Sequence, residues 1–167
     1  IQIKPKCNEE KLKKNINKST KPSNITKFLS FEKAKSISQT KKYFDHYVIG
    51  CDTLIYLENK VFNKARNIKE ANLKIRKLSG KTHKIVSGLT ICKNGRAIWQ
   101  CSETTNVKIK KLSTKEIKAY LSKTGPQILN SVGCYHIESL GPQIIENIKQ
   151  LMINYFYGAF QTDFGKV

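Results

Sequence analysis

Apolar residues recur along this chain with two different spacings, and each spacing predicts its own kind of element. Short runs of β-branched or alternating apolar residues predict strands. The predicted strands cover residues 48–51, 54–57, 60–62, 84–92, 97–101 and 107–110. Glu58-Asn59 separates the second run from the third, and Asn94-Gly95 separates the fourth from the fifth. Because Asn-Gly readily adopts the tight turn of a hairpin, the fourth and fifth runs are predicted to pair.

Apolar residues three and four positions apart predict helices between these strands. The predicted helices cover residues 22–37, 67–78, 113–122 and 142–151. Two of them begin with the spacing of a capping box, which places Asn67 before Glu70 and Ser113 before Glu116. Residues 6–22 are polar and predict a loop with a poor helix.

Helices and strands alternate irregularly, which favours an α/β or mixed α+β fold. We expect a curved, mixed β-sheet flanked by helices. The chain has 167 residues, which is enough to bury a core, and it is expected to form a single domain over residues 1–167.

Positive charge dominates the surface chemistry, because the formal net charge is +19. Such a charge suggests a nucleic-acid-binding module as one alternative. However, 28 of the 31 basic residues are Lys, and they are spread along the whole chain. Base and phosphate recognition favours Arg, whose planar guanidinium binds bidentately. Solvated Lys faces are therefore the preferred interpretation, and no dedicated nucleic-acid partner is expected.

The sequence has no run of eighteen apolar residues and no apolar segment near its start, so neither a membrane span nor a signal peptide is expected. Five cysteines are widely spaced, and no two of them form a C-x-x-C pair. Reduced thiols and a cytoplasmic location are the simpler interpretation, and a zinc site is not indicated.

The stretch Val48-Ile-Gly-Cys-Asp-Thr53 ends an apolar run in one acidic residue. The only other carboxylates within ten residues are Asp45 and Glu58. A strand that carries a lone carboxylate at its C-terminal end often places a metal ligand or general base in a cleft. The alternative is an Asp that caps a turn, and the segment alone leaves both open.

Three further segments and one lysine accompany that stretch. They are Phe31-Glu-Lys-Ala34, Lys64, Leu78-Ser-Gly-Lys-Thr-His83 and Gly133-Cys-Tyr-His-Ile-Glu138. Their order and spacing resemble the Maf family of nucleoside triphosphate pyrophosphatases, also called septum formation inhibitors, over roughly residues 3–150. The resemblance implies a Maf or inosine-triphosphatase-like fold. It also implies hydrolysis of a nucleoside triphosphate to the monophosphate and pyrophosphate, and a possible homodimer.

The resemblance places the catalytic carboxylate on Asp52, within the V-I-G-A-D-T pattern. A second carboxylate falls on Glu9, with Asn8 where the family usually has Asp. Both would hold a divalent cation, Mg²⁺ or Mn²⁺, through hard oxygen ligands. Asp52 would also orient or deprotonate the attacking water, and an ordinary surface role remains the alternative for Glu9.

Substrate-binding roles fall on four more residues. Lys33 and Lys64 would be point charges on the triphosphate, although Ala65 replaces the proline that usually follows the second lysine. Glu138 would accept hydrogen bonds from the base or sugar, or support the metal. Thr82 would line the nucleotide pocket just past a helix end. Solvated side chains are the alternative for both lysines in so Lys-rich a chain.

Two features of the resemblance point to different substrates. Asp52-Thr53 resembles the branch that acts on dTTP and UTP, whereas Glu138 in place of Gln resembles the branch that acts on 7-methyl-GTP. For His83 and Tyr135 a structural role is favoured over a catalytic one.

The sequence departs from the family at both ends. It has no S-x-S-x-x-R phosphate loop, so an N-terminally incomplete domain is expected, and residues 152–167 form a divergent tail. A non-catalytic nucleotide-binding remnant is the alternative to an enzyme.

Overall fold

The structure, a computed structural model, describes residues 1–17, 19–58 and 60–149. Contacts divide the chain into two compact units. Among the described residues, the first unit contains 1–53 and 86–104, and the second contains 54–85 and 105–149. The single domain expected from chain length stays a prediction. The expected divergent tail at residues 152–167 lies outside the described residues.

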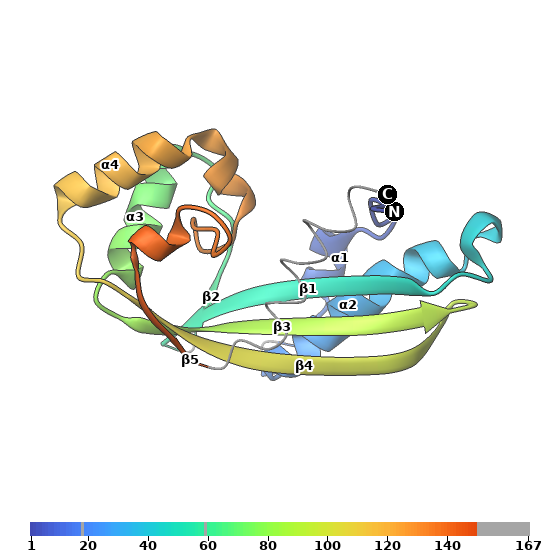
Figure 1. Cartoon of the computed structure of the whole chain (residues 1–167). Coiled ribbons are helices and arrows are strands. Elements are labelled where there is room, and N and C mark those ends of the chain that lie inside the picture. Colours follow the sequence, from blue (N-terminus) through green and yellow to red (C-terminus); the bar gives the residue numbers. More distant parts are fainter. Residues whose placement is uncertain (18, 59, 150–167) are drawn as a thin grey trace. The chain divides into compact units, whose positions relative to one another are not determined.

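Within the described residues, five strands form one antiparallel sheet in the order β2-β1-β3-β4-β5 (Figure 1). Their bounds are β1 Val48–Leu57, β2 Lys60–Phe62, β3 Thr82–Lys93, β4 Arg96–Ile109 and β5 Ile145–Lys149. The register pairs Leu57 with Lys60 and Val107 with Ile148. The α+β class is therefore confirmed, with antiparallel rather than mixed pairing.

Several predicted runs join into longer strands. The runs at 48–51 and 54–57 are one strand, β1, so Asp52 lies in the middle of a strand and not at its end. Likewise the runs at 97–101 and 107–110 both fall on β4, which ends at Ile109. In each case polar residues interrupt the apolar pattern while the backbone stays extended. An extended backbone depends on pairing with a neighbouring strand, which the pattern of one segment does not report.

The predicted helix over residues 142–151 is wrong. The chain forms a short 3-10 helix, η3, over Gly141–Gln143 and then strand β5. Ile144, Ile145 and Ile148 are β-branched, which favours an extended backbone. Their neighbours find hydrogen-bond partners on β4, where the register pairs Ile109 with Ile145. Residues 150 and 151 lie outside the described residues.

In the described part of the first unit, two helices and one 3-10 helix accompany the sheet. They are α1 Glu9–Lys14, α2 Pro22–Ser38 and η1 Lys41–Tyr43. Helix α2 confirms the helix predicted after residue 22, and Pro22 stands in its first turn, where a missing N–H does no harm. The face that α2 buries is rich in small and hydroxyl-bearing residues. One of them, Ser30, shares a 2.7 Å hydrogen bond between its Oγ and Oγ1 of Thr90 in β3.

In the second unit, α3 Ile68–Leu78 and α4 Thr114–Thr124 pack against each other, followed by the 3-10 helix η2 Pro126–Asn130 (Figure 1). Both predicted capping residues are confirmed. Asn67 accepts from the Glu70 backbone N–H, and Ser113 and Glu116 form a complete capping box. The core of this unit is apolar and almost fully buried. It includes Ile75, Leu78, Val107, Ile117 and Ile128.

No helix within the described part of the chain is long and apolar enough to cross a membrane.

Candidate active site

Asp52 is a buried carboxylate in the middle of β1, with only 4% of its surface exposed. Its Oδ1 accepts a hydrogen bond from Nζ of Lys33 at 2.5 Å. Its Oδ2 is buried and has no hydrogen-bond partner among the described residues. Since a buried carboxylate oxygen is costly to leave unsatisfied, this atom marks a position where a ligand would be stabilised.

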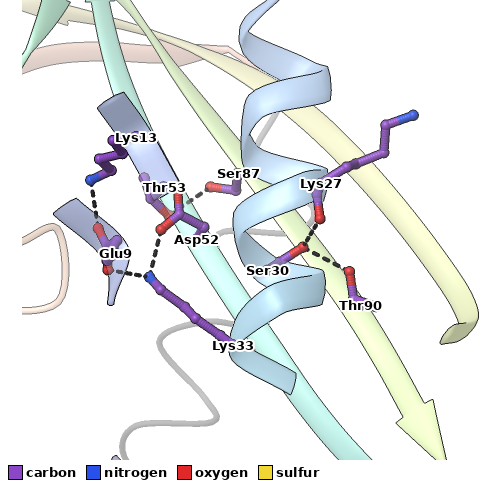
Figure 2. Close-up of polar contacts among 9 residues, drawn as sticks. All are labelled: Glu9, Lys13, Lys27, Ser30, Lys33, Asp52, Thr53, Ser87 and Thr90. Carbon is purple, nitrogen blue, oxygen red and sulfur yellow. Dashed lines mark hydrogen bonds and ion pairs between the residues drawn. The ribbon is translucent and has the colours of Figure 1, made fainter. Parts of the chain in front are cut away.

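Lys33 and Glu9 complete a three-residue cluster in the first unit (Figure 2). Lys33 comes from α2, and its Nζ lies 2.5 Å from Asp52 and 3.1 Å from Oε2 of Glu9. Glu9 is the first residue of α1, which begins where the Asn8 side chain accepts from the Lys11 backbone N–H. One ammonium therefore bridges two carboxylates that lie 43 residues apart in the sequence.

Burial and charge act against each other in this cluster. Burial raises the pKa of Asp52 above its ordinary value, although the Lys33 ammonium opposes the rise. Burial also disfavours the charged form of Lys33, but Asp52 and Glu9 outweigh it and raise the pKa of that amine. For Glu9, burial is outweighed by a hydrogen bond from Lys13 and by the charge of Lys33, which lower its pKa to about 2. A carboxylate whose pKa is raised is a better proton acceptor, so Asp52 is the stronger base of the two.

Lys13 forms an ion pair with Oε1 of Glu9 at 2.5 Å and was not among the site residues predicted from the sequence. The signal was present, since a Glu four residues before a Lys on a helix favours such a pair. Ser87 was not predicted either, and its Oγ lies 3.3 Å from Oγ1 of Thr53 (Figure 2). That pair joins β1 to β3, and no local pattern in either strand reports it.

The other predicted site residues belong to the second unit. Lys64 is exposed in the loop between β2 and α3, and Thr82 is exposed at the first position of β3. Glu138 is exposed in a turn before η3. The structure thus brings Asp52, Lys33 and Glu9 together, while the remaining three side chains are exposed within the other unit.

His83 and Tyr135 are buried in the second unit. The His83 Nε2 and the Tyr135 hydroxyl are 2.6 Å apart, and His83 is 1% exposed. Burial lowers the pKa of His83 to about 4, so the ring is neutral near pH 7. Both residues therefore pack in the core, as the structural interpretation of the sequence expected.

The carboxylates of the cluster suit a divalent cation whose remaining ligands are water or substrate oxygens. No group of three or more His, Cys, Asp and Glu side chains is placed to hold a metal in residues 1–17, 19–58 and 60–149. Yet Asp52 and Glu9 offer hard oxygen donors, and the buried Oδ2 of Asp52 lacks a partner within the same residues. Mg²⁺ is commonly held by one or two carboxylates together with water and substrate phosphates. Asp52 and Glu9 would supply the two carboxylates of such a site.

Comparison with known proteins adds an independent line of evidence. The Maf-like protein family model matches residues 1–154. The chain is 40% identical over 133 residues to a 7-methyl-GTP pyrophosphatase of Bartonella quintana. The aligned stretch covers 80% of this chain and 66% of the relative. It is 37% identical over 149 residues to a dTTP/UTP pyrophosphatase of Thermosipho melanesiensis, covering 89% of this chain and 77% of the relative.

A nucleoside triphosphate pyrophosphatase of Legionella pneumophila (strain Lens) is 32% identical over 150 residues, which is 89% of this chain and 72% of the relative. The chain spans about two thirds to three quarters of the length of these three curated relatives, from 66% to 77%. Since the family model matches residues 1–154 and so covers all of the described residues, the expected resemblance is confirmed, and the chain belongs to the Maf-like protein family.

Proposed function

We propose that this protein hydrolyses a nucleoside triphosphate to the monophosphate and pyrophosphate, and so acts as a hydrolase on an acid anhydride. One observation carries the proposal. A buried carboxylate, Asp52, keeps one oxygen without a partner among the described residues while a lysine ammonium contacts the other. The names of the relatives agree with it, because each relative quoted above is described as a pyrophosphatase.

The chemistry of the cluster suits attack by water on a phosphoryl group, which requires an oriented nucleophile and neutralised charge. Asp52 would accept a proton from the attacking water or orient it through a hydrogen bond. Lys33 would place a positive charge beside the phosphate oxygens, where negative charge increases in the transition state. A divalent cation held by Asp52 and Glu9, Mg²⁺ or Mn²⁺, would supply further charge neutralisation on the triphosphate.

Roles for the exposed residues of the second unit form part of the same proposal. Lys64 would contribute a second point charge to the triphosphate. Thr82 would contact the nucleotide, and Glu138 would accept hydrogen bonds from the base or sugar. Their exposure leaves these side chains free to meet a ligand from solution.

The nucleotide itself is proposed as either 7-methyl-GTP or the dTTP/UTP pair. Relatives described by each of these names match the chain, at 40% and 37% identity. Glu138 favours the first, because a carboxylate accepts hydrogen bonds from the N–H groups of a guanine edge. A homodimer and a cytoplasmic location complete the proposal. For the location, the support is that all five cysteines are free thiols.

The test is pyrophosphate release in the presence of Mg²⁺, measured for 7-methyl-GTP, dTTP, UTP and the common triphosphates. We expect release from one class of nucleotide and its loss when the metal is chelated. Asp52→Asn should lower the rate by at least about 100-fold, since a general base contributes roughly 10²–10⁴-fold. Asp45→Asn, which changes an exposed carboxylate on the same stretch of chain, is the matched control and should keep the rate.

Two results would contradict the proposal. Turnover that survives in Asp52→Asn would remove this carboxylate from the mechanism. Nucleotide binding without pyrophosphate release, under conditions in which the wild-type protein is folded, would indicate the non-catalytic nucleotide-binding remnant instead.

A further inference from the structure

The Lys33 ammonium lies where a bound cation would be expected. Its Nζ contacts Oδ1 of Asp52 at 2.5 Å and Oε2 of Glu9 at 3.1 Å (Figure 2). These are the same two carboxylates that would hold a divalent cation. The metal-free cluster is thus already neutralised in part by a side chain of the protein itself.

We propose that Lys33 is an internal counter-ion, which leaves the carboxylates and moves to the phosphates when metal and nucleotide bind together. This inference rests on the proposed function and adds a regulatory property to the same site. Free metal ions bind poorly because Lys33 competes for the carboxylates. A metal–nucleotide complex binds well because its phosphates offer the displaced ammonium a new partner.

The counter-ion is needed because two carboxylates so placed repel each other. The Asp52 side chain is only 3% exposed, so water screens its charge weakly. Without a cation nearby, burial of an ionised carboxylate is strongly unfavourable. Lys33 relieves this repulsion when no metal is bound, and it is therefore a competitor that any metal must displace.

Of Lys33 and Asp52, the two residues in closest contact, Lys33 is the one that can move. Asp52 is fixed within β1, whereas the Lys33 side chain is 18% exposed and ends a flexible four-carbon chain. Lys33 is the only one of the three whose charge suits a phosphate, and an ammonium binds phosphate as readily as carboxylate. Lys13 stays on the other oxygen of Glu9 and does not touch Asp52 in any contact found among the described residues.

Competition of this kind couples the two ligands. If nucleotide draws Lys33 away from the carboxylates, then nucleotide raises the affinity for metal, and metal raises the affinity for nucleotide by the same factor. The site would in this way select metal-bound nucleotide over either component alone.

The first experiment measures binding of Mn²⁺ alone, by electron paramagnetic resonance of the free ion, to metal-free protein without nucleotide. Lys33→Met removes the competitor at nearly constant side-chain volume. We expect it to bind Mn²⁺ at least tenfold more tightly than the wild-type protein. Lys35→Met removes the same charge from the same helix, but its ammonium packs over the Phe31 ring, so its affinity should stay within about twofold.

Equal or weaker Mn²⁺ binding by folded Lys33→Met would overturn the inference. The double variant with Asp52→Asn should lose the gain, and a gain that persists would also overturn it, because the extra ion would be bound elsewhere. This outcome is separate from that of the proposed function. Pyrophosphate release with no gain in Mn²⁺ affinity would reject only the counter-ion, and a gain without release would reject only the enzyme.

A second experiment uses the wild-type protein, in case Lys33→Met does not fold. Acetic anhydride labels amines, and mass spectrometry reports the rate for each lysine. Lys33 should be labelled slowly in metal-free protein and at least threefold faster in 10 mM Mn²⁺ without nucleotide. The labelling rate of Lys35 should stay unchanged. No acceleration at Lys33 under saturating Mn²⁺ would contradict displacement.

Discussion

Gly50 allows α2 to approach β1 closely enough for Lys33 to reach Asp52. A Cβ at position 50 would overlap the carbonyl oxygen of Ser30. It would also lie 2.8 Å from the backbone nitrogen of Ala34 and 2.9 Å from its Cβ, well below the 3.4 Å at which ordinary contact begins. All three atoms belong to the helix backbone or to its first side-chain carbon, so none can rotate away. Gly50→Ala therefore requires the whole helix to shift.

The expected loss follows from that geometry. Overpacking a close contact costs typically about 1–3 kcal/mol, and contact with backbone atoms places this substitution at the upper end, about 3 kcal/mol. That loss lowers the ratio of folded to unfolded protein about 150-fold. For a chain of this size, it lowers the melting temperature by about 6–12 °C.

The assay is urea or thermal unfolding followed by circular dichroism. Cys51→Ala, at the next position on the strand and half-buried, is the control, and it should lose less than about 1 kcal/mol. Because the helix carries Lys33, Gly50→Ala should also lower the rate of pyrophosphate release in the protein that remains folded. A Gly50→Ala variant within about 0.5 kcal/mol of the wild type would show that the helix does not lie this close to the strand.

Three further predictions concern single interactions. Burial holds the pKa of His83 near 4 against an ordinary 6.5, so as the pH falls the unfolded chain binds a proton at this residue before the folded protein does. The stability present above pH 6.5 should therefore decline by about 3 kcal/mol towards pH 4. In urea unfolding measured across this pH range, His83→Gln should lose this part of the decline. Ser113→Ala removes the capping box of α4 and should cost about 1 kcal/mol in urea unfolding, and an unchanged midpoint would argue against the cap. A thiol reagent should modify buried Cys92 and Cys134 more slowly than the three half-buried cysteines in folded protein, and equal rates would contradict the burial.

Local features of this protein were predictable from the sequence because nearby residues create them. The two helix starts at Asn67 and Ser113 depend on hydrogen bonds within three residues, and both were correct. The Asn94-Gly95 turn is also local, because both residues take a positive φ that Asn and Gly tolerate. The order of motifs, a property of the chain alone, was sufficient to identify the family.

The final strand shows where local reasoning failed. Residues 145–149 form a strand because β4 offers them hydrogen-bond partners, and helical spacing in the sequence contains no information about that partner. Asp52 was likewise expected at a strand end, yet β1 continues past it to Leu57. Pairing between distant strands overrides local preference in both places.

The candidate site was only partly determined by the sequence. Asp52 and Lys33 were each singled out by their motifs, and Glu9 by a weaker one. The packing of α1 and α2 near β1 has two consequences that the sequence did not predict. One ammonium bridges both carboxylates, and Oδ2 of Asp52 is buried without a partner in the described chain. Charges separated by many residues interact only once the fold has brought them together and excluded water, and so only the tertiary structure decided the electrostatics of this site.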